Sequence, residues 1–334
     1  MKICQCCRTN PANKTNTHYL TDGIIRNCLN ELGSNKREKG AMFDISSSKT
    51  SIEFAFQRST SQRAIIEGLG HEPSEKEIEE AKHNAFSVDY VFCSACEEKF
   101  GEIERPFMEE ILPKFRDKDM SGTTELVLVE NIVIRKFFLL QIFRTSIAEN
   151  EYWISEELEN KLRSMIMDES ADNTQILSIP LNISYLNTAG GDFDYTRNTV
   201  GIAYLENHKI ILFNDFLIQF FEKPSEIIYV DFFRVNDKAS VSYFTNFNEE
   251  SFRFKVFDPI KREEVLANYL KFKVRQMLEF YVQDFQEAFF HKRGFLPSRH
   301  ELSVFITEII NGNRFQEFQR YSHARYEKIK AQYI

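Results

Sequence analysis

Residues 1–23 read MKICQCCRTNPANKTNTHYLTDG, and residues 91–104 read VFCSACEEKFGEIE. Each stretch contains two cysteines separated by two residues. Because a C-x2-C turn points two sulfurs at one centre, two such pairs predict a tetrahedral zinc site made of four thiolates. The predicted metal ligands are Cys4, Cys7, Cys93 and Cys96. A shared zinc site would be split between two distant parts of the chain, and with 85 residues between the pairs the alternative is that the two knuckles do not share a metal.

The chain has six cysteines, so two remain outside these pairs. Cys6 lies within the first pair and could replace Cys7 as a ligand, whereas Cys28 is expected to be a small buried hydrophobic residue. Redox chemistry is the least favoured interpretation, because no βαβ pattern surrounds either pair.

Composition and charge limit the classes of protein to consider. With 334 residues, 43% of them hydrophobic and 32 of them Phe, the chain can bury a large core and is expected to form two domains. It begins without the pattern of a signal peptide and has no clean apolar run of about 20 residues, so we expect a cytoplasmic protein with no membrane partner. The net charge of −8 argues against a general polyanion binder, although residues 1–40 contain seven basic and three acidic side chains.

The order of predicted elements indicates an α+β fold. Residues 1–115 are expected to form a zinc-bound domain, interrupted by a polar insertion at about 31–86. Within it, a short helix is predicted near 73–86, a strand at 88–92 and a helix from Glu97.

Residues 121–334 are expected to form a larger, aromatic-rich α+β domain with long helices and an antiparallel sheet, used for substrate or partner recognition. The apolar run 126–143 predicts a buried helix, because its charged residues are too costly for a membrane span. Three to five strands should follow, with a hairpin turn at residues 206–209. Further helices are predicted at 155–167 and 262–292 and from about Ser298, and the loop 190–198 is either a polar turn or a binding loop.

Candidate catalytic residues lie next to the cysteine pairs. His18 follows the first pair and could act as a general base, or else be a fifth zinc ligand or an ordinary surface or core histidine. Glu97 and Glu104 are about two turns apart on one face of the predicted helix, with Gly101 between them leaving room for a ligand. Glu97 could equally compensate the dipole at the start of that helix.

Taken in order, these motifs resemble the treble-clef, ββα-metal endonucleases of the HNH family. The resemblance rests on the first C-x2-C pair, on KTNTHYL at residues 14–20 and on FCSACEEKFGEIE at residues 92–104. More closely, the chain is similar to an uncharacterised bacterial group of HNH-like proteins with a Ser/Thr-His motif and a C-x2-C-Glu segment followed by a second Glu. Only the N-terminal third carries motifs specific to this family.

The resemblance implies roles for individual residues. The four paired cysteines would hold structural Zn²⁺, His18 would be the general base, and Glu97 or Glu104 would belong to a catalytic site for Mg²⁺ or another divalent ion. The chain departs from the family pattern at Thr17, where an acidic metal ligand usually precedes the base, and at Asp89, near the usual position of an Asn. The final His of the pattern is also absent, unless Glu104 replaces it.

Three functions are consistent with the sequence. The resemblance favours a metal-dependent endonuclease acting on DNA more than on RNA, as the effector of a bacterial antiviral defence system with a partner protein as sensor or activator. The second is a noncatalytic zinc module that binds nucleic acid or protein. The third is a structural subunit whose Phe-rich domain packs against a larger partner.

Overall fold

The computed structural model describes most of the chain. The described residues are 2–25, 41–44, 53–56, 63, 66, 71–80, 86–116, 118–168, 173–187, 200–205, 208–227, 233–311 and 322–334. The chain divides into two compact units, the first made of Met1–Cys28 and Asn84–Leu266 and the second of Leu29–His83 and Ala267–Ile334. The first unit contains both the cysteine pairs and a large sheet, so it includes residues from both sides of the domain boundary predicted at 116–120, which stays a prediction.

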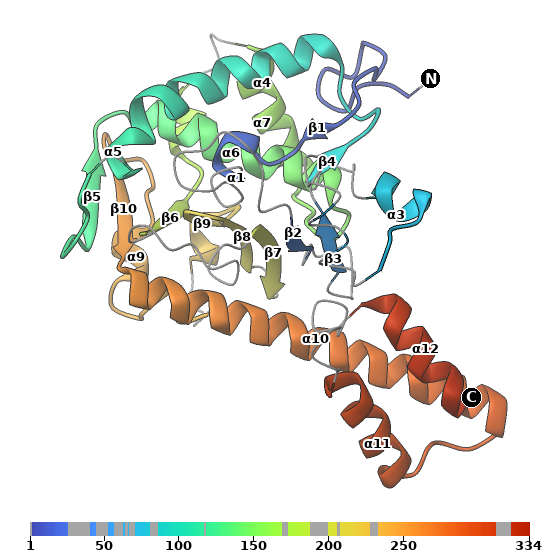
Figure 1. The fold of residues 1–334 in the computed structure, drawn as a ribbon. Helices are drawn as coiled ribbons and strands as arrows, with labels where there is room; N and C mark the ends of the chain where they lie inside the picture. The colour runs from blue at the N-terminus through green and yellow to red at the C-terminus, as the bar shows by residue number, and fades with distance from the viewer. Residues whose placement is uncertain are drawn as a thin grey trace. The chain divides into compact units, whose positions relative to one another are not determined.

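A six-stranded sheet organises the first unit, and the α+β class expected from the sequence is confirmed (Figure 1). The strands, in their spatial order, are β5 (Glu125–Leu128), β10 (Phe252–Phe257), β6 (Leu181–Leu186), β9 (Phe216–Phe220), β8 (His208–Phe213) and β7 (Val200–Leu205). Three of the four inner strands, β6, β9 and β8, are buried along their whole length. Burial on both faces explains why apolar residues often stand at consecutive positions of these strands, as in IILF of β8, instead of alternating with polar ones.

Between the helices predicted at 155–167 and 262–292 the described residues form five strands, β6 to β10, so the expectation of three to five strands is confirmed. The expectation of an antiparallel sheet was wrong in one respect, because β10 runs parallel to β6, with Phe254 opposite Ile183, while the other pairs are antiparallel. Strand β10 runs opposite to β9 and lies on the other side of β6, so the connection from β9 to β10 crosses β6, and it contains the helices η4 (Pro224–Glu226) and α9 (Val241–Phe244). Strand periodicity alone gives no information on such a crossover.

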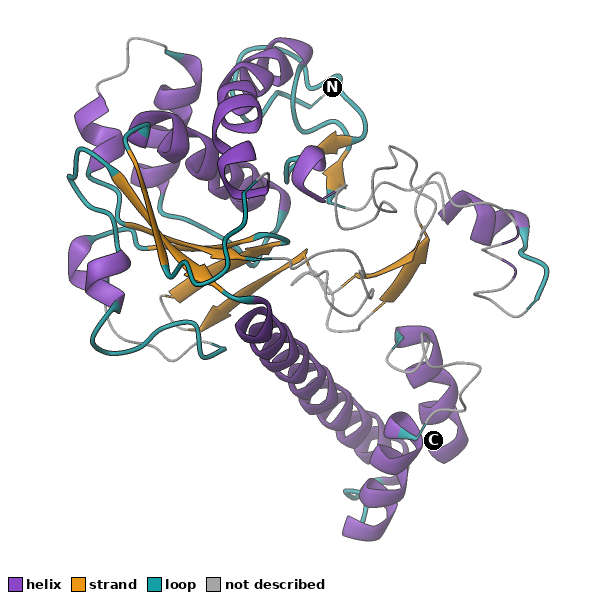
Figure 2. Cartoon of the chain, turned by 60° about the vertical axis from the view of Figure 1, so that its left-hand side comes forward, coloured by secondary structure: helices purple, strands orange, loops and turns teal. Residues whose placement is uncertain are grey.

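Three helices lie on one side of the sheet, namely α4 (Ser94–Pro106), α6 (Asn131–Ala148) and α7 (Glu156–Met167) (Figures 1 and 2). Helix α4 continues into the π-helical segment η2 (Phe107–Ile111), where the buried Phe107 stacks on Phe137 with ring centroids 3.8 Å apart. Phe107 also meets Phe216 of the sheet edge to face, at 5.9 Å. The helix after the second cysteine pair therefore shares one aromatic core with α6 and the sheet.

The apolar run 126–143 is a strand followed by a helix. Residues up to Leu128 belong to β5, and α6 begins at Asn131, with Glu130 as its N-cap residue. The prediction of one buried helix was therefore wrong for the first residues, since Val127 is partly exposed on the edge strand β5 and Val129, just after this strand, is largely exposed. None of the described helices is both long enough and apolar enough to cross a membrane.

The second unit contains most of the long helix α10 (Pro259–Arg293), together with α11 (Arg299–Ile310) and α12 (His323–Tyr333). Within it, Tyr326 of α12 stacks on Tyr281 of α10, with ring centroids 3.9 Å apart. The unit also holds α3 (Glu75–Glu80) and an antiparallel pair made of β2 (Ala41–Asp44) and β3 (Glu53–Phe56). The stretch interpreted as a polar insertion thus contains regular structure.

Several predictions fall on residues that the structure describes only in part. Strand β8 begins at His208, so the last two residues of the hairpin turn predicted at 206–209 belong to the strand, and residues 206–207 lie outside the described residues. The loop 190–198 and Cys28 also lie outside them, as do residues 81–85 at the end of the predicted short helix. The helices predicted at 155–167 and 262–292 are confirmed as α7 and α10.

Candidate functional site

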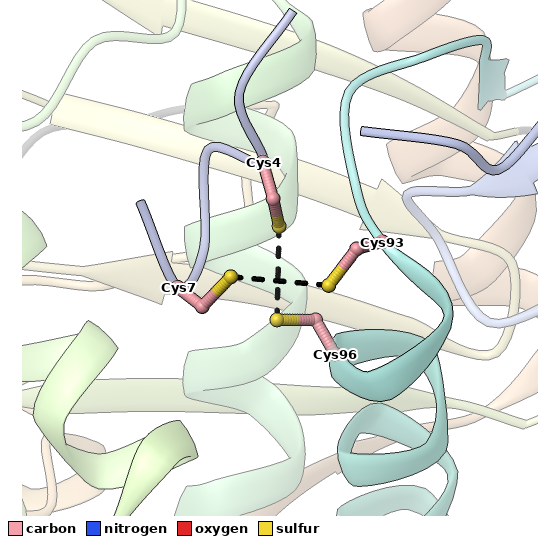
Figure 3. A group of neighbouring side chains, drawn as sticks. All are labelled: Cys4, Cys7, Cys93 and Cys96. Carbon is pink, nitrogen blue, oxygen red and sulfur yellow. Dashed lines mark hydrogen bonds between the residues drawn. The ribbon is translucent and has the colours of Figure 1, made fainter. Parts of the chain in front are cut away.

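Four sulfur atoms converge at the N-terminal end of the first unit. Cys4 Sγ is 3.7 Å from Cys96 Sγ, Cys7 Sγ is 3.8 Å from Cys93 Sγ, and all four sulfurs lie within 4.8 Å of one another. Figure 3 shows that the thiols point toward a common centre from two segments of the chain. A tetrahedral zinc ion with Zn–S bonds of about 2.3 Å holds its sulfurs about 3.8 Å apart. The cluster can therefore hold a metal ion such as zinc, and the two predicted pairs do come together.

Backbone hydrogen bonds shape the first knuckle and join it to the second. Arg8 N donates to Cys4 O at 2.9 Å, and Arg8 has a φ of 57°, so the turn folds back on itself after the first cysteine pair. Gln5 N donates to Val91 O, also at 2.9 Å, which ties this turn to the segment before the second pair. Four sulfurs from distant parts of the sequence are thus brought together by the main chain itself.

The surroundings of the cluster shift the pKa values of Cys4 and Cys7 in opposite directions. Burial raises the pKa of Cys4 to about 12. Burial acts in the same direction on Cys7, but hydrogen bonds from Thr9 and Asn10 outweigh it and lower the pKa of Cys7 to about 6. A bound Zn²⁺ deprotonates coordinating thiols, because only the thiolate is a ligand. Without a metal ion, buried thiols such as Cys4 would stay protonated at neutral pH.

Cys6 lies outside the group of four. It is fully buried, and its sulfur contacts Met167 Sδ of α7 at 3.8 Å. Arg163 of the same helix donates to Gln5 O at 3.3 Å. The position between the two ligands therefore packs against α7, which leaves Cys7 as the residue of the first pair that faces Cys93.

His18 lies on the strand that leaves the first knuckle. This strand, β1 (Thr17–His18), pairs antiparallel with β4 (Ser87–Val88), and α4 begins a few residues later. The strand predicted at 88–92 was too long, because Tyr90 has a φ of 57° and cannot continue an extended strand. Asp22 Oδ1 is 3.9 Å from His18 Nε2, so this carboxylate stabilises the imidazole when it is protonated.

Glu97 lies in the first turn of α4 and is partly buried. Burial raises the pKa of this carboxyl, the positive charge of Arg144 lowers it, and the negative charge of Glu104 raises it. The Thr17 hydroxyl is close enough to lower this pKa too, but Thr17 Oγ1 and Glu97 Oε1 do not reach regular hydrogen-bond geometry with any described residue. Its position still allows the alternative role of compensating the helix dipole.

Glu104 lies on the same face of α4 and is held by a buried arginine. Glu104 Oε1 accepts hydrogen bonds from Arg144 Nη2 of α6 and, at 2.6 Å, from the Thr21 hydroxyl. The Arg144 side chain is only 4% exposed, and its guanidinium lies 5.4 Å from the centre of the Phe100 ring. A side-chain carbon added at Gly101, between the two glutamates, would have no described atom within 4 Å. The expected room beside the helix is therefore present.

The structure brings the segment that carries His18 against both glutamates. Thr17 faces Glu97, and Thr21 donates a hydrogen bond to Glu104, so the stretch that contains His18 runs along the acidic face of α4. Within the described residues, however, the four cysteines are the one group of three or more Cys, His, Asp or Glu close enough to hold a metal ion. The predicted catalytic divalent ion thus has no ready-made cage of three such side chains and stays a prediction.

Sequence reasoning missed two residues of this site. Asp22 carries a weak signal, since it follows His18 by four residues at the start of helix α1 (Asp22–Ile25). Arg144 directly follows the apolar run 126–143, and the sequence does not identify Glu104 as its partner across the fold. A buried charge within an apolar helix was the available signal, because such a charge needs a partner.

Comparison with protein-family models, curated proteins and solved structures finds no match. The candidate site therefore has to be interpreted from its own geometry.

Proposed function

We propose that the chain is a metal-dependent endonuclease of the HNH type, with DNA as the more favoured substrate over RNA. One observation carries the proposal, namely that His18, on a strand leaving a four-cysteine cluster, lies in a segment that faces Glu97 and is hydrogen-bonded to Glu104 of the following helix. The order of knuckle, strand, strand, knuckle and helix supports a treble-clef module.

In this proposal each residue has a defined task. Neutral His18 accepts a proton from the attacking water, and Asp22 stabilises the imidazolium that results. Glu97 or Glu104 would hold a divalent ion such as Mg²⁺, which supplies positive charge to the scissile phosphate. Because Mg²⁺ commonly binds through one or two carboxylates, with water and phosphate completing its shell, a preformed cage is not required. The cysteine cluster holds Zn²⁺ as a structural ion.

The direct test is cleavage by the purified chain. It is incubated with supercoiled DNA, linear DNA and RNA in Mg²⁺, Mn²⁺ or EDTA, beside His18→Ala and a control, His300→Ala, which changes an exposed histidine of α11. We expect metal-dependent cleavage by the wild type and the control, and a loss of at least about 10²-fold in His18→Ala, the usual contribution of a general base. Equal cleavage by His18→Ala would refute the assigned role of His18.

Gly101 offers a second test that does not remove a functional group. Ala is a better helix former than Gly by about 0.5–1 kcal/mol, and Gly101 has room for a methyl group, so Gly101→Ala should stabilise the protein. If substrate or metal enters between Glu97 and Glu104, the larger variant Gly101→Leu should lower cleavage while the melting temperature is kept. Full activity in Gly101→Leu would show that this space is not used.

A noncatalytic zinc module is the second candidate, and two observations favour it. The Glu104 carboxylate already accepts a hydrogen bond from Arg144, and Thr17 stands where an acidic metal ligand would precede the base. In that case the chain would bind DNA, RNA or a protein with zinc-dependent affinity and would cleave nothing under any metal condition. A cytoplasmic defence role, a sensor or activator partner, and recognition of substrate or partner by the rest of the chain stay predictions.

A further inference from the structure

Helix α6 is mostly apolar, yet several of its polar side chains are buried. Twelve of its residues are buried, among them Gln141 and Arg144. Both lie on the side that faces α4 and the segment after β1, as their contacts show. A buried arginine is costly unless its charge and its hydrogen bonds are satisfied. Its presence in an otherwise apolar helix therefore calls for an explanation beyond packing.

The two side chains form one network with the candidate site. Arg144 Nη2 donates to Glu104 Oε1, to Gln141 Oε1 at 3.0 Å and to Thr21 Oγ1 at 3.2 Å. Gln141 Oε1 also accepts from the backbone N–H of Thr21 at 3.0 Å, while Gln141 Nε2 is fixed by a bond to Phe137 O at 3.2 Å. The network joins α6, α4 and the segment that contains His18.

The hydrogen bonds of this network involve only one of the two carboxylate oxygens of Glu104. Both donors act on Glu104 Oε1, and no hydrogen bond from the described residues reaches Oε2. A carboxylate fixed through one oxygen presents the other in a defined direction, which suits a metal ligand or an acceptor for water. The bond between Thr21 N and Gln141 similarly fixes the backbone three residues after His18.

We propose that Arg144 is a positioning residue of the candidate nuclease site. Through Glu104 Oε1 it orients the carboxylate, and through Thr21 and Gln141 it holds the segment that carries His18. The chemical consequence rests on the proposed function. The site is then completed by α6, a helix from beyond the cysteine-bearing third of the chain.

The same helix offers a matched control for a purely structural arginine. Arg135 is fully buried in α6 and donates to the carbonyls of Ile176 and Ile179 and to Asn131 Oδ1. Arg135→Gln and Arg144→Gln remove comparable buried charges from one helix, but the described contacts of Arg135 involve no site residue. Zinc content and melting temperature are measured for both variants, and rates are referred to the folded fraction.

Kinetics separate positioning from packing. We expect Arg144→Gln to lower kcat by about 10²-fold with KM within about threefold, since orientation of reacting groups affects the transition state more than the ground state. The kcat of Arg144→Lys should lie between those of Arg144→Gln and the wild type, because one ammonium group cannot replace the planar guanidinium. Guanidinium ion added to Arg144→Ala should raise kcat again. Equal losses of kcat in Arg135→Gln and Arg144→Gln, without rescue, would overturn the assignment.

An NMR signal makes the test independent of cleavage. The imidazole Cε1–H resonance of His18 should shift in Arg144→Gln and not in Arg135→Gln, while that of His300 should move in neither. If no variant cleaves nucleic acid but this shift occurs, the positioning role stands and the proposed function fails. If His18-dependent cleavage exists, and Arg144→Gln keeps the wild-type kcat and an unmoved His18 resonance, the positioning role fails and the proposed function stands.

Discussion

The cysteine cluster makes a quantitative prediction that distinguishes Cys7 from its neighbour Cys6. Both thiols lie in the first knuckle, but only Cys7 belongs to the group of four, whereas Cys6 packs against Met167. We therefore expect Cys7→Ser to weaken zinc binding and Cys6→Ala to leave it nearly unchanged. The sequence alone left open which of the two is the ligand.

The size of the effect follows from the symmetry of the site. Structural zinc contributes about 10–16 kcal/mol in small zinc domains, so an equal share for each of four thiolates is about 2.5–4 kcal/mol. Loss of Cys7 should therefore weaken zinc binding by about 10²–10³-fold. Cys6→Ala removes one buried sulfur and should lower stability modestly, with a zinc affinity within about threefold of the wild type.

Two measurements check this prediction. Elemental analysis after dialysis gives zinc per chain, which should be one for the wild type and for Cys6→Ala, and competition with a chelating dye gives the affinities. The absorption spectrum of the cobalt-substituted protein reports the number of thiolate ligands. Wild-type affinity in Cys7→Ser, together with zinc loss in Cys6→Ala, would refute the assignment and make Cys6 the fourth ligand.

Three further predictions concern stability. Phe107→Ala should cost about 3–5 kcal/mol in urea unfolding, because it removes the ring that packs on Phe137 and the sheet, and a loss under 1 kcal/mol would contradict this. Burial lowers the pKa of His208 from its ordinary value of about 6.5. As the pH falls below about 6.5, His208 is therefore protonated in the unfolded chain before it is protonated in the folded chain. Stability should fall as the pH drops below about 6.5, by up to about 1.4 kcal/mol per unit, and His208→Gln should remove this slope in unfolding curves recorded between pH 5 and 8. Ser298→Ala should destabilise α11 by about 1 kcal/mol, seen as faster amide exchange in its first turn, because the capping box with Glu301 is lost.

Local patterns in the sequence predicted much of the secondary structure. Helix α7 begins after Ser155, whose hydroxyl accepts a hydrogen bond from Leu158 N, and α10 follows the apolar periodicity closely. The predictions were wrong where strand pairing or tertiary packing determines the conformation of a segment. Residues 126–143 form one apolar run in the sequence but adopt two conformations, a strand and a helix, because the first part pairs with β10 as an edge strand. The parallel register of β10 on β6 likewise depends on a crossover that periodicity does not encode.

The sequence by itself determined the cysteine pairs, the position of His18 and the shared helix face of Glu97 and Glu104, because residue type and spacing along one segment fix these features. Only the tertiary structure decided that Cys7 and not Cys6 belongs to the group of four sulfurs, and that Glu104 binds Arg144. Both depend on residues far away in the sequence. Contacts between distant segments arise when the core forms, and no local pattern specifies which polar groups they bring together.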